Sequence, residues 1–435
     1  MALAQRTSLI ASAWLGVLPV SAAPERPLQE RLDAAPVGAV IEVSPGAYHG
    51  RLVIRKPVSL VGRGRPAING GGKGSVVTIL ADDVTVRGFL ITGSGADLMQ
   101  DDAGIFVQAS RAAIESNRIE NALHGVYLKK AKDGRLVGNR ITGMTTLPGP
   151  AKAASSAADT LDMCAPVARN INIRGNGIHL WNSSGVLIER NRITESRDGI
   201  YFSFSDECVV RRNVIRKVRY GLHYMYSDRN RFEENHFTES AAGAAMMYSK
   251  GLAVSRNIFE ANRGFRAYGL LLSAVDRTRI EHNRIVSNNV GIYMENSNGN
   301  LFLRNDVAGN YIGIRLTASS DDNRFSRNRF RNNLHPAELA GVSGTNNWSA
   351  GGTGNYWQHA APVDLDGDGV GELPHRQADT LGKLRESFPL VSLLSGSPAL
   401  ELLEFAQQQV ELPGLSAIED PAPLVAPSAA APPAR

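Results

Sequence analysis

A glycine followed by an apolar residue recurs along most of the chain, and the commonest interval between these glycines is 22 residues. The glycines are Gly104, Gly125, Gly177, Gly199, Gly221, Gly243, Gly269, Gly291 and Gly313. A second motif, Asn followed by any residue and then an apolar one, repeats in phase at Asn117, Asn139, Asn191, Asn213, Asn235, Asn257, Asn283, Asn305 and Asn328. Two independent motifs with one period indicate an architecture of stacked, similar units.

Each unit contains two or three short runs in which apolar and polar residues alternate, separated by Asn, Gly, Ser or Asp. None of the units carries a heptad or a helical stripe, so one unit predicts one coil of short strands. The expected fold is all-β: a right-handed, single-stranded parallel β-helix over residues 24–345, with coils of about 22 residues.

The alternation of strand side chains fixes which positions face the interior. The first and third residues after each glycine are apolar and are predicted to lie inside, which makes Met246 and Met294 core residues. Cys208, five places before Asn213, is predicted to be a small buried residue. Functional side chains are expected in the outward columns, two and four places after each glycine.

The N-terminus has the layout of a cleaved secretory signal. An apolar run from Leu9 to Val20 precedes the small residues Ala22 and Ala23, so residues 1–23 are predicted to be removed on export. A short uncleaved anchor is the alternative. No later segment approaches the ~18 apolar residues of a membrane span, so we expect the mature chain in the periplasm.

Several segments depart from the repeat. Residues 28–32 predict a short N-terminal capping helix, and the excess length between Gly125 and Gly177 predicts a side loop over residues 142–176. Residues 346–419 are expected to form a C-terminal cap with an Asp-Gly loop and a helical extension. The Pro-Ala-rich stretch 420–435 is expected to be disordered.

One group of outward residues suits a soft metal ion. His223 and Met225 lie two residues apart on one strand, and Met247 should be the lateral neighbour of Met225 in the next coil, ~4.8 Å away. One imidazole and two thioethers favour Cu(I) and discriminate against Zn²⁺ and Ca²⁺. The alternative is that the methionines are surface filler or a hydrophobic docking patch.

Secondary copper candidates are His179, in the same outward column, and the Met163-Cys164 pair of the side loop. A thiolate beside a thioether could accept or pass on Cu(I), whereas an unpaired, partly buried cysteine is the alternative. The two cysteines of the chain form no disulfide framework.

A different metal is suggested by the alternating carboxylates of Asp364, Asp366 and Asp368, which precede a glycine as in a Ca²⁺-binding loop. His375 stands where an EF-hand has its bidentate glutamate, so only a weak calcium site is predicted. A rigid Asx-type turn is the alternative.

The surface chemistry argues against two other classes of protein. The net charge of +5 arises from 47 basic residues mixed with 42 acidic ones, which does not favour nucleic-acid binding. Polysaccharide-cleaving β-helices need clustered acids on one outward face, and the outward columns after glycine offer only Glu295. We therefore expect no catalytic site, although a carbohydrate-binding role stays open.

The runs Gly175–Ser183, Gly199–Tyr201, Gly221–Ser227 and Gly354–Trp357 resemble the NosD family of copper-binding accessory proteins. The likeness covers nearly the whole mature chain, although Gln358 and His359 replace the family's usual aspartate and tyrosine. It implies a role in assembling the copper centres of nitrous oxide reductase. It also implies, as partners, the permease and ATPase subunits of an ABC transporter, a copper chaperone, and the reductase itself.

Overall fold

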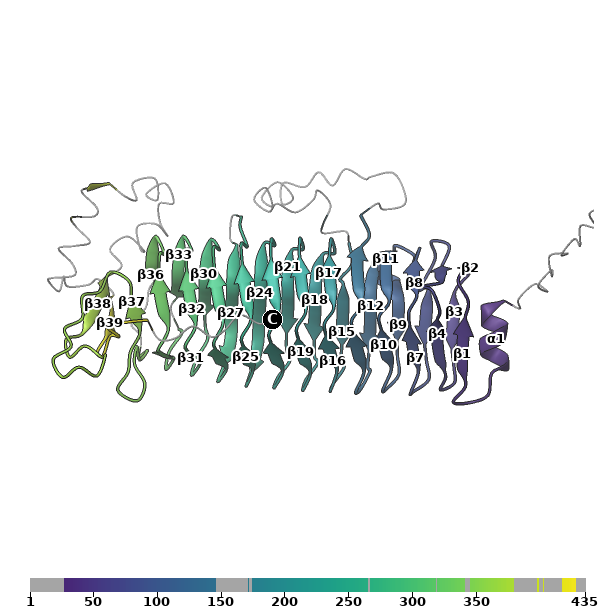
Figure 1. Ribbon diagram of the computed structural model, residues 1–435, viewed down its shortest axis with the longest axis horizontal. Coiled ribbons are helices and arrows are strands. Elements are labelled where there is room, and N and C mark those ends of the chain that lie inside the picture. Colours follow the sequence, from purple (N-terminus) through teal and green to yellow (C-terminus); the bar gives the residue numbers. More distant parts are fainter. Residues whose placement is uncertain are drawn as a thin grey trace, which may run out of the picture.

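The computed structural model describes residues 27–145, 171, 174–264, 267–317, 319–340, 345–378, 397–398, 402 and 417–427. Figure 1 shows the strands stacked in sequence order along one elongated rod, with helix α1 (Leu28–Ala34) at its N-terminal end. The strands of the rod form three parallel sheets, so the predicted parallel β-helix is confirmed. No helix in the described part of the chain is long and apolar enough to cross a membrane.

Sheet A receives the first strand of each coil and has 12 strands. In stacking order these strands are β1 (Val40–Val43), β4 (Ser59–Gly62), β7 (Thr85–Arg87), β10 (Ala113–Glu115), β13 (Arg135–Val137), β16 (Leu187–Glu189), β19 (Val209–Arg211), β22 (Arg231–Glu233), β25 (Ala253–Ser255), β28 (Arg279–Glu281), β31 (Leu301–Leu303) and β34 (Arg324–Ser326).

Sheet B receives the second strand of each coil and has 13 strands. These strands are β2 (Ala47–His49), β5 (Ala67–Asn69), β8 (Leu90–Thr92), β11 (Arg118–Ala122), β14 (Arg140–Gly143), β17 (Arg192–Thr194), β20 (Val214–Arg216), β23 (His236–Thr238), β26 (Ile258–Glu260), β29 (Arg284–Val286), β32 (Asp306–Ala308), β35 (Arg329–Arg331) and β37 (Tyr356–Trp357).

Sheet C contains the strands that carry the recurring glycines, and it has 12 strands. They are β3 (Leu52–Ile54), β6 (Val77–Ile79), β9 (Ala103–Val107), β12 (His124–Lys129), β15 (Ile178–Trp181), β18 (Asp198–Ser203), β21 (Tyr220–Met225), β24 (Ala242–Lys250), β27 (Tyr268–Asp276), β30 (Val290–Glu295), β33 (Ile312–Thr317) and β36 (His335–Ala340). A short 3₁₀ helix, η1 (Leu98–Gln100), precedes β9.

The glycine column of sheet C is required by close packing between coils. A Cβ atom added to Gly199 would lie 2.3 Å from Ile215 Cγ2 of sheet B and 2.6 Å from the carbonyl oxygen of Gly221. The side chains that follow are placed as the alternation predicts, since Met246 and Met294 are both fully buried. Cys208 is buried as well, and burial raises the pKa of its thiol to about 12.

The asparagines of the second motif form a continuous ladder inside the helix. The Nδ2 of each asparagine donates to the Oδ1 of the asparagine one coil further, with N···O distances of 2.9–3.2 Å. The ladder begins at Asn117 and ends at Asn355. The second Nδ2 proton reaches a backbone carbonyl, as from Asn213 to Ile188. Because buried amides need partners, this pattern explains the recurrence of asparagine at one position.

Helix α1 closes the N-terminal end of the rod, as predicted. Leu28 and Leu32 pack into the core. Gln29 accepts a hydrogen bond from the backbone N–H of Val53 at 2.8 Å and donates to its carbonyl at 3.0 Å. The helix thus covers the end of sheet C and satisfies backbone groups of β3.

The C-terminal end differs from the expectation in the extent of the coils. Coil stacking continues past residue 345, because β37 pairs with β35 and Trp357 stacks on Phe330 with ring centroids 4.4 Å apart. Within the stretch 420–435, for which disorder is expected, the structure describes residues 420–427: Asp420 ends β39 (Ala417–Asp420), the antiparallel partner of β38 (His375–Ala378), and residues 421–427 follow it. Almost all of the predicted helical extension, together with residues 1–26 and 428–435, lies outside the described residues.

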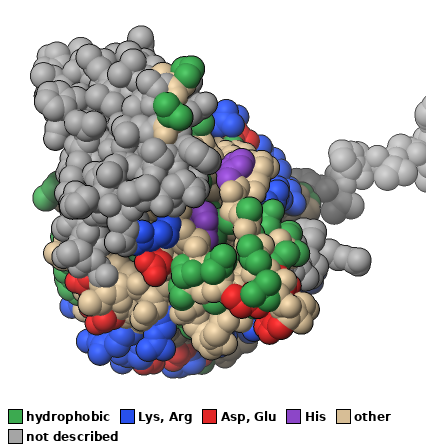
Figure 2. All heavy atoms as spheres, turned by 90° about the vertical axis from the view of Figure 1, so that its left-hand side faces the viewer, with side chains coloured by type: hydrophobic (Ala, Val, Ile, Leu, Met, Phe, Trp, Pro, Cys, Tyr) green, Lys and Arg blue, Asp and Glu red, His purple; other side chains and the backbone are tan. Residues whose placement is uncertain are grey.

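The end-on view of Figure 2 looks onto this C-terminal face, where hydrophobic side chains gather on the described surface. Among the described residues from 345 to 427, the exposed large hydrophobic side chains are Val363, Leu365, Leu373, Leu402 and Val425.

Candidate functional site

Five rings stand side by side on the outer face of sheet C, one from each of five successive coils. Neighbouring ring centroids are 5.7, 4.3, 4.5 and 4.9 Å apart. In stacking order the rings belong to Phe106, Tyr127, His179, Tyr201 and His223. They occupy the outward column two places after each glycine, where the sequence predicted functional side chains.

His223 is held by a buried acid from the preceding coil. Its Nδ1 lies 2.9 Å from Asp198 Oδ2, and Arg219 binds the same carboxylate through two nitrogens at 2.9 and 2.7 Å. Burial alone would raise the pKa of Asp198, but the hydrogen bonds from His223 and Arg219 outweigh burial and lower this pKa. An ionised carboxylate only accepts hydrogen bonds, so His223 Nδ1 carries a proton and donates it in a hydrogen bond to Asp198.

The other two histidines of the site are arranged in the opposite way. The backbone N–H of Asn176 donates to His124 Nδ1 at 3.0 Å, and the Asn176 side-chain amide lies 3.3 Å from His179 Nδ1. In both rings Nδ1 then accepts, so the proton of the neutral ring sits on Nε2. Burial lowers the pKa of His124 to about 4 and that of His179 well below its ordinary value, which keeps both rings neutral.

Two buried polar atoms beside these rings make no hydrogen bond with the described residues, namely Asn176 Oδ1 and Arg197 Nε. Burial and the neighbouring Arg219 lower the pKa of Arg197. Buried polar groups in native proteins are normally satisfied, so unpaired ones beside an outward row of rings are typical of a binding site.

The two methionines are adjacent, as predicted. Met225 of β21 and Met247 of β24 are direct register partners, and both side chains are partly exposed. Met225 follows His223 by two residues on the same face of the strand, ~6.5 Å further along. The structure therefore places one imidazole and two thioethers on one outer face, in two adjacent coils.

Two residues of this site, Asp198 and His124, were not predicted from the sequence. Each stands directly before a glycine, where strict alternation would assign its side chain to the interior. The structure places them beside the outward column instead, as the contacts of Asp198 with His223 and of His124 with His179 show. The signal that could have revealed them is a polar residue at a position that strand alternation assigns to the interior.

The remaining copper candidates are placed as follows. Met163 and Cys164 lie outside the described residues. Trp181, four places after Gly177, lies beneath the ammonium groups of Lys129 and Lys130, 5.5 and 5.8 Å from the ring centroid.

The Asp-Gly loop brings together a different set of carboxylates from the predicted one. Oxygens of Asp364, Asp366 and Glu372 lie within 4.8 Å of one another, with Glu372 in place of Asp368. Several of these oxygens already accept backbone N–H groups, as Asp364 does from Gly367 at 2.7 Å. This pattern matches the Asx-type turn that was the alternative to a calcium loop.

Acidic groups on the outer face of sheet C are more numerous than predicted. Glu295 accepts hydrogen bonds from Ser273 and Tyr293, at 2.6 and 3.1 Å. A second acid, Glu338, pairs with Arg315 at 2.7 Å. The glycine motif did not reveal Glu338, because Pro336 takes the place of the glycine in its coil.

The sequence matches two family models. Residues 155–361 match the family described as "Periplasmic copper-binding protein (NosD)". Residues 51–228 match one described as "Protein of unknown function (DUF1565)".

The chain is also similar to two curated proteins, each named "Probable ABC transporter binding protein NosD". The protein from Pseudomonas aeruginosa is 36% identical over 98% of this chain and 96% of its own length. The protein from Stutzerimonas stutzeri is 35% identical over 87% of this chain and 85% of its own length.

Among solved structures, the A-module of the Azotobacter vinelandii mannuronan C-5 epimerase AlgE6 has a TM-score of 0.56 to this chain. It is 14% identical and covers 77% of this chain and 94% of the module. This likeness supports the β-helix fold alone. The sequence relatives go further, since they share more than a third of their residues over almost the full length, and on that basis the chain belongs to the NosD family of periplasmic copper-binding proteins.

Proposed function

We propose that this protein is an accessory factor for assembly of the copper centres of nitrous oxide reductase, and that it holds or relays Cu(I) at His223, Met225 and Met247. The family is described as copper-binding, and the relatives are named as binding proteins of an ABC transporter. In this proposal the chain works in the periplasm with the permease and ATPase subunits of such a transporter. A copper chaperone supplies the ion, and the reductase receives it.

The observation that carries the proposal is the hydrogen bond between His223 Nδ1 and Asp198. A carboxylate that takes the proton of one ring nitrogen orients the other nitrogen toward a metal and increases its basicity. With Met225 and Met247 beside it, the imidazole of His223 completes a donor set that suits Cu(I). The thioethers need no deprotonation, so only the histidine makes binding depend on pH.

His179 is the weaker candidate, since its Nδ1 faces the Asn176 amide and its Nε2 carries a proton. It must change tautomer, or Asn176 must turn, before it can bind an ion through Nε2. We assign His179 a secondary place on a transfer route, together with Met163 and Cys164. Three further expectations stay predictions. They are Ca²⁺ binding at Asp364, Asp366 and Asp368, signal cleavage after residue 23, and contact with the transporter through the C-terminal extension.

Titration of the purified chain with Cu(I) against a chromophoric chelator tests the proposal. The variant Met225→Leu/Met247→Leu keeps the size and apolar character of both side chains but removes the sulfur atoms. We expect this variant to lose at least tenfold in Cu(I) affinity, and His223→Ala to lose as much.

The matched control is Met99→Leu/His236→Ala, since the Met99 side chain is 88% exposed and His236 lies on sheet B. An unchanged affinity in the double leucine variant would leave the methionines as a hydrophobic docking patch and would reject them as ligands.

A further inference from the structure

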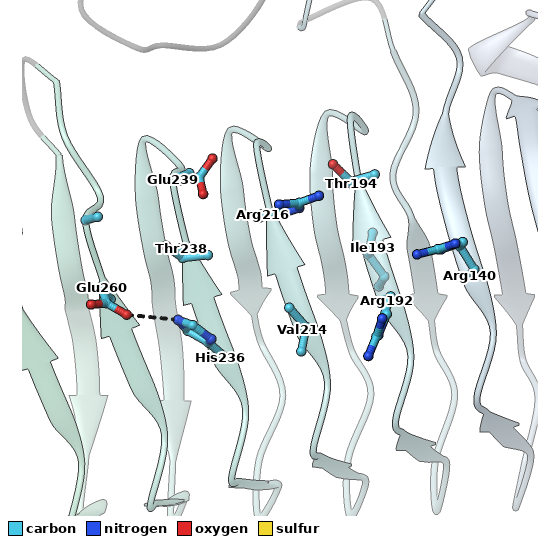
Figure 3. Close-up of a pocket in the computed structure, with 11 residues that line it drawn as sticks. Arg140, Arg192, Ile193, Thr194, Val214, Arg216, His236, Thr238, Glu239 and Glu260 are labelled. Carbon is cyan, nitrogen blue, oxygen red and sulfur yellow. Dashed lines mark hydrogen bonds and ion pairs between the residues drawn. The ribbon is translucent and has the colours of Figure 1, made fainter. Parts of the chain in front are cut away.

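A groove of about 640 Å³ runs across five strands of sheet B, from β14 to β26. Figure 3 shows Arg140 and Arg216 extending toward each other from either side of β17, with Thr194 between them. Arg192 lies on the same strand as Thr194, and Ile193, only 1% exposed, forms part of the floor. The groove is separate from the copper candidate, which lies on the outer face of sheet C.

The three arginines have no acidic partner among the described residues. No ion pair joins Arg140, Arg192 or Arg216 to any carboxylate there, although all three are exposed. Arg140 and Arg192 are direct register partners, so their Cα atoms lie ~4.8 Å apart. Like charges in directly paired positions destabilise a sheet, and a bound anion would relieve this repulsion.

Three of the four other arginines in strands of this sheet are neutralised, whereas Arg284 of β29 has no ion pair with the described residues. At the C-terminal end of sheet B, Arg329 and Arg331 both pair with Asp306, at 3.0 and 2.7 Å. In the coil before the groove, Arg118 pairs with Glu120. The fold therefore supplies acids to arginines of this sheet at other coils, and leaves the groove arginines without them.

The opposite end of the groove has a different character. His236 Nε2 lies 3.2 Å from Glu260 Oε2, and Glu239 also lines this end. The positive region is consequently short, limited to the three coils that carry Arg140, Arg192 and Arg216. A ligand that fills the groove must be acidic where it meets β14 to β20, and neutral or basic where it meets Glu239.

We propose that this groove binds a short acidic segment of a partner polypeptide through its carboxylate groups. Guanidinium groups pair bidentately with carboxylates, and two of them converging from either side of Thr194 can hold one such group. The exposed side chain of Val214 offers apolar contact to the rest of the peptide. No Phe, Tyr or Trp is among the described residues that line the groove, so a sugar has none of these rings to stack on, and a flat lipid surface cannot reach the floor of the groove.

Binding of fluorescein-labelled hexaglutamate to the full mature chain at low ionic strength tests this assignment. The groove variant is Arg140→Gln/Arg192→Gln/Arg216→Gln. Its matched control, Arg135→Gln/Arg231→Gln/Arg279→Gln, removes the same charge from exposed arginines at the starts of strands in sheet A. Circular dichroism confirms that both variants are folded.

We expect hexaglutamate to bind, the groove variant to bind at least tenfold more weakly, and the control to stay within about twofold of the parent. Equal weakening in both variants would mean general charge attraction and would overturn the site, as would the absence of binding to the parent. Tighter binding of trigalacturonate, or of vesicles rich in phosphatidylglycerol, would overturn the assignment to a peptide. Cu(I) affinity should be unchanged in the groove variant, which separates this inference from the copper proposal.

Discussion

Asp420 accepts hydrogen bonds from both nitrogens of Asn355, from the backbone N–H at 2.7 Å and from Nδ2 at 3.2 Å. Trp357 Nε1 donates to the same carboxylate oxygen at 2.9 Å. A carboxylate from β39 thus stands where the next asparagine of the ladder would be. The C-terminal segment returns to the rod and ends the ladder with a buried acceptor.

Replacement of Asp420 should therefore destabilise the C-terminal end of the rod. Asp420→Ala removes the acceptor of the Asn355 backbone N–H and of Trp357 Nε1, at about 1–3 kcal/mol for each buried group. Asp420→Asn keeps an acceptor oxygen at the same place and should cost less than half as much. Urea unfolding followed by tryptophan fluorescence measures the free energy of unfolding of both variants. Equal losses of this free energy would show that the hydrogen bonds accepted by Asp420 do not stabilise the C-terminal end.

A second prediction concerns the glycine column. Gly199→Ala places a Cβ atom 2.3 Å from Ile215 and 2.6 Å from the Gly221 carbonyl, so the coils must move apart. Overpacking of this kind typically costs about 1–3 kcal/mol. Gly46→Ala is the control, since its nearest neighbour would be Tyr48 at an ordinary 3.6 Å. Thermal unfolding of the two variants should separate them, and similar midpoints would contradict the packing argument.

The buried histidines make stability depend on pH. Burial holds the pKa of His124 at about 4, against 6.5 in the unfolded chain, so the folded state excludes a proton that the unfolded state accepts. The stability from neutral His124 is complete above pH 6.5 and is lost as pH falls toward 4. At 1.36 kcal/mol per pKa unit, this amounts to roughly 3 kcal/mol.

His124→Gln should accordingly flatten the fall in unfolding free energy between pH 6.5 and 4. The exposed His49 serves as the control, and His49→Gln should leave the slope as it is in the parent. A slope that does not change in His124→Gln would mean that His124 is protonated without cost in the fold.

Asp198 should act on copper through His223 and not as a ligand. Asp198→Asn loses the anionic acceptor that fixes the proton on His223 Nδ1, and loss of such a partner typically weakens metal binding about 10–100-fold. The pH dependence of Cu(I) affinity should also change, which a purely structural role would not cause. Chelator competition at several pH values measures this, and a variant with the parent profile would remove Asp198 from the site.

Much of the fold could be predicted because the repeat fixes the length of a coil and the positions of its inward and outward side chains. Gly199 and Asn213 each belong to a column that has the same residue type in most coils, and strand alternation then places Met246 inside and Met225 outside. The closing contact could not be found in this way, because Asp420 joins Asn355 across 65 residues that lie outside the repeat.

The site was predictable to the same extent. His223, Met225 and Met247 follow from the register of neighbouring coils. Asp198 does not, because it precedes its glycine and falls in a phase that alternation assigns to the interior. The arginine groove was not predicted either, since the unpaired Arg140 and Arg192 follow an asparagine of the second motif just as the paired Arg118 does.

X-ray absorption spectroscopy at the copper edge of the Cu(I)-loaded chain would identify the atoms that bind the ion. We expect one nitrogen and two sulfur atoms bound to copper in the parent, and loss of the sulfur contribution in Met225→Leu/Met247→Leu. A parent spectrum with nitrogen and oxygen scatterers only, or a sulfur contribution that persists in the leucine variant, would contradict copper binding at these residues.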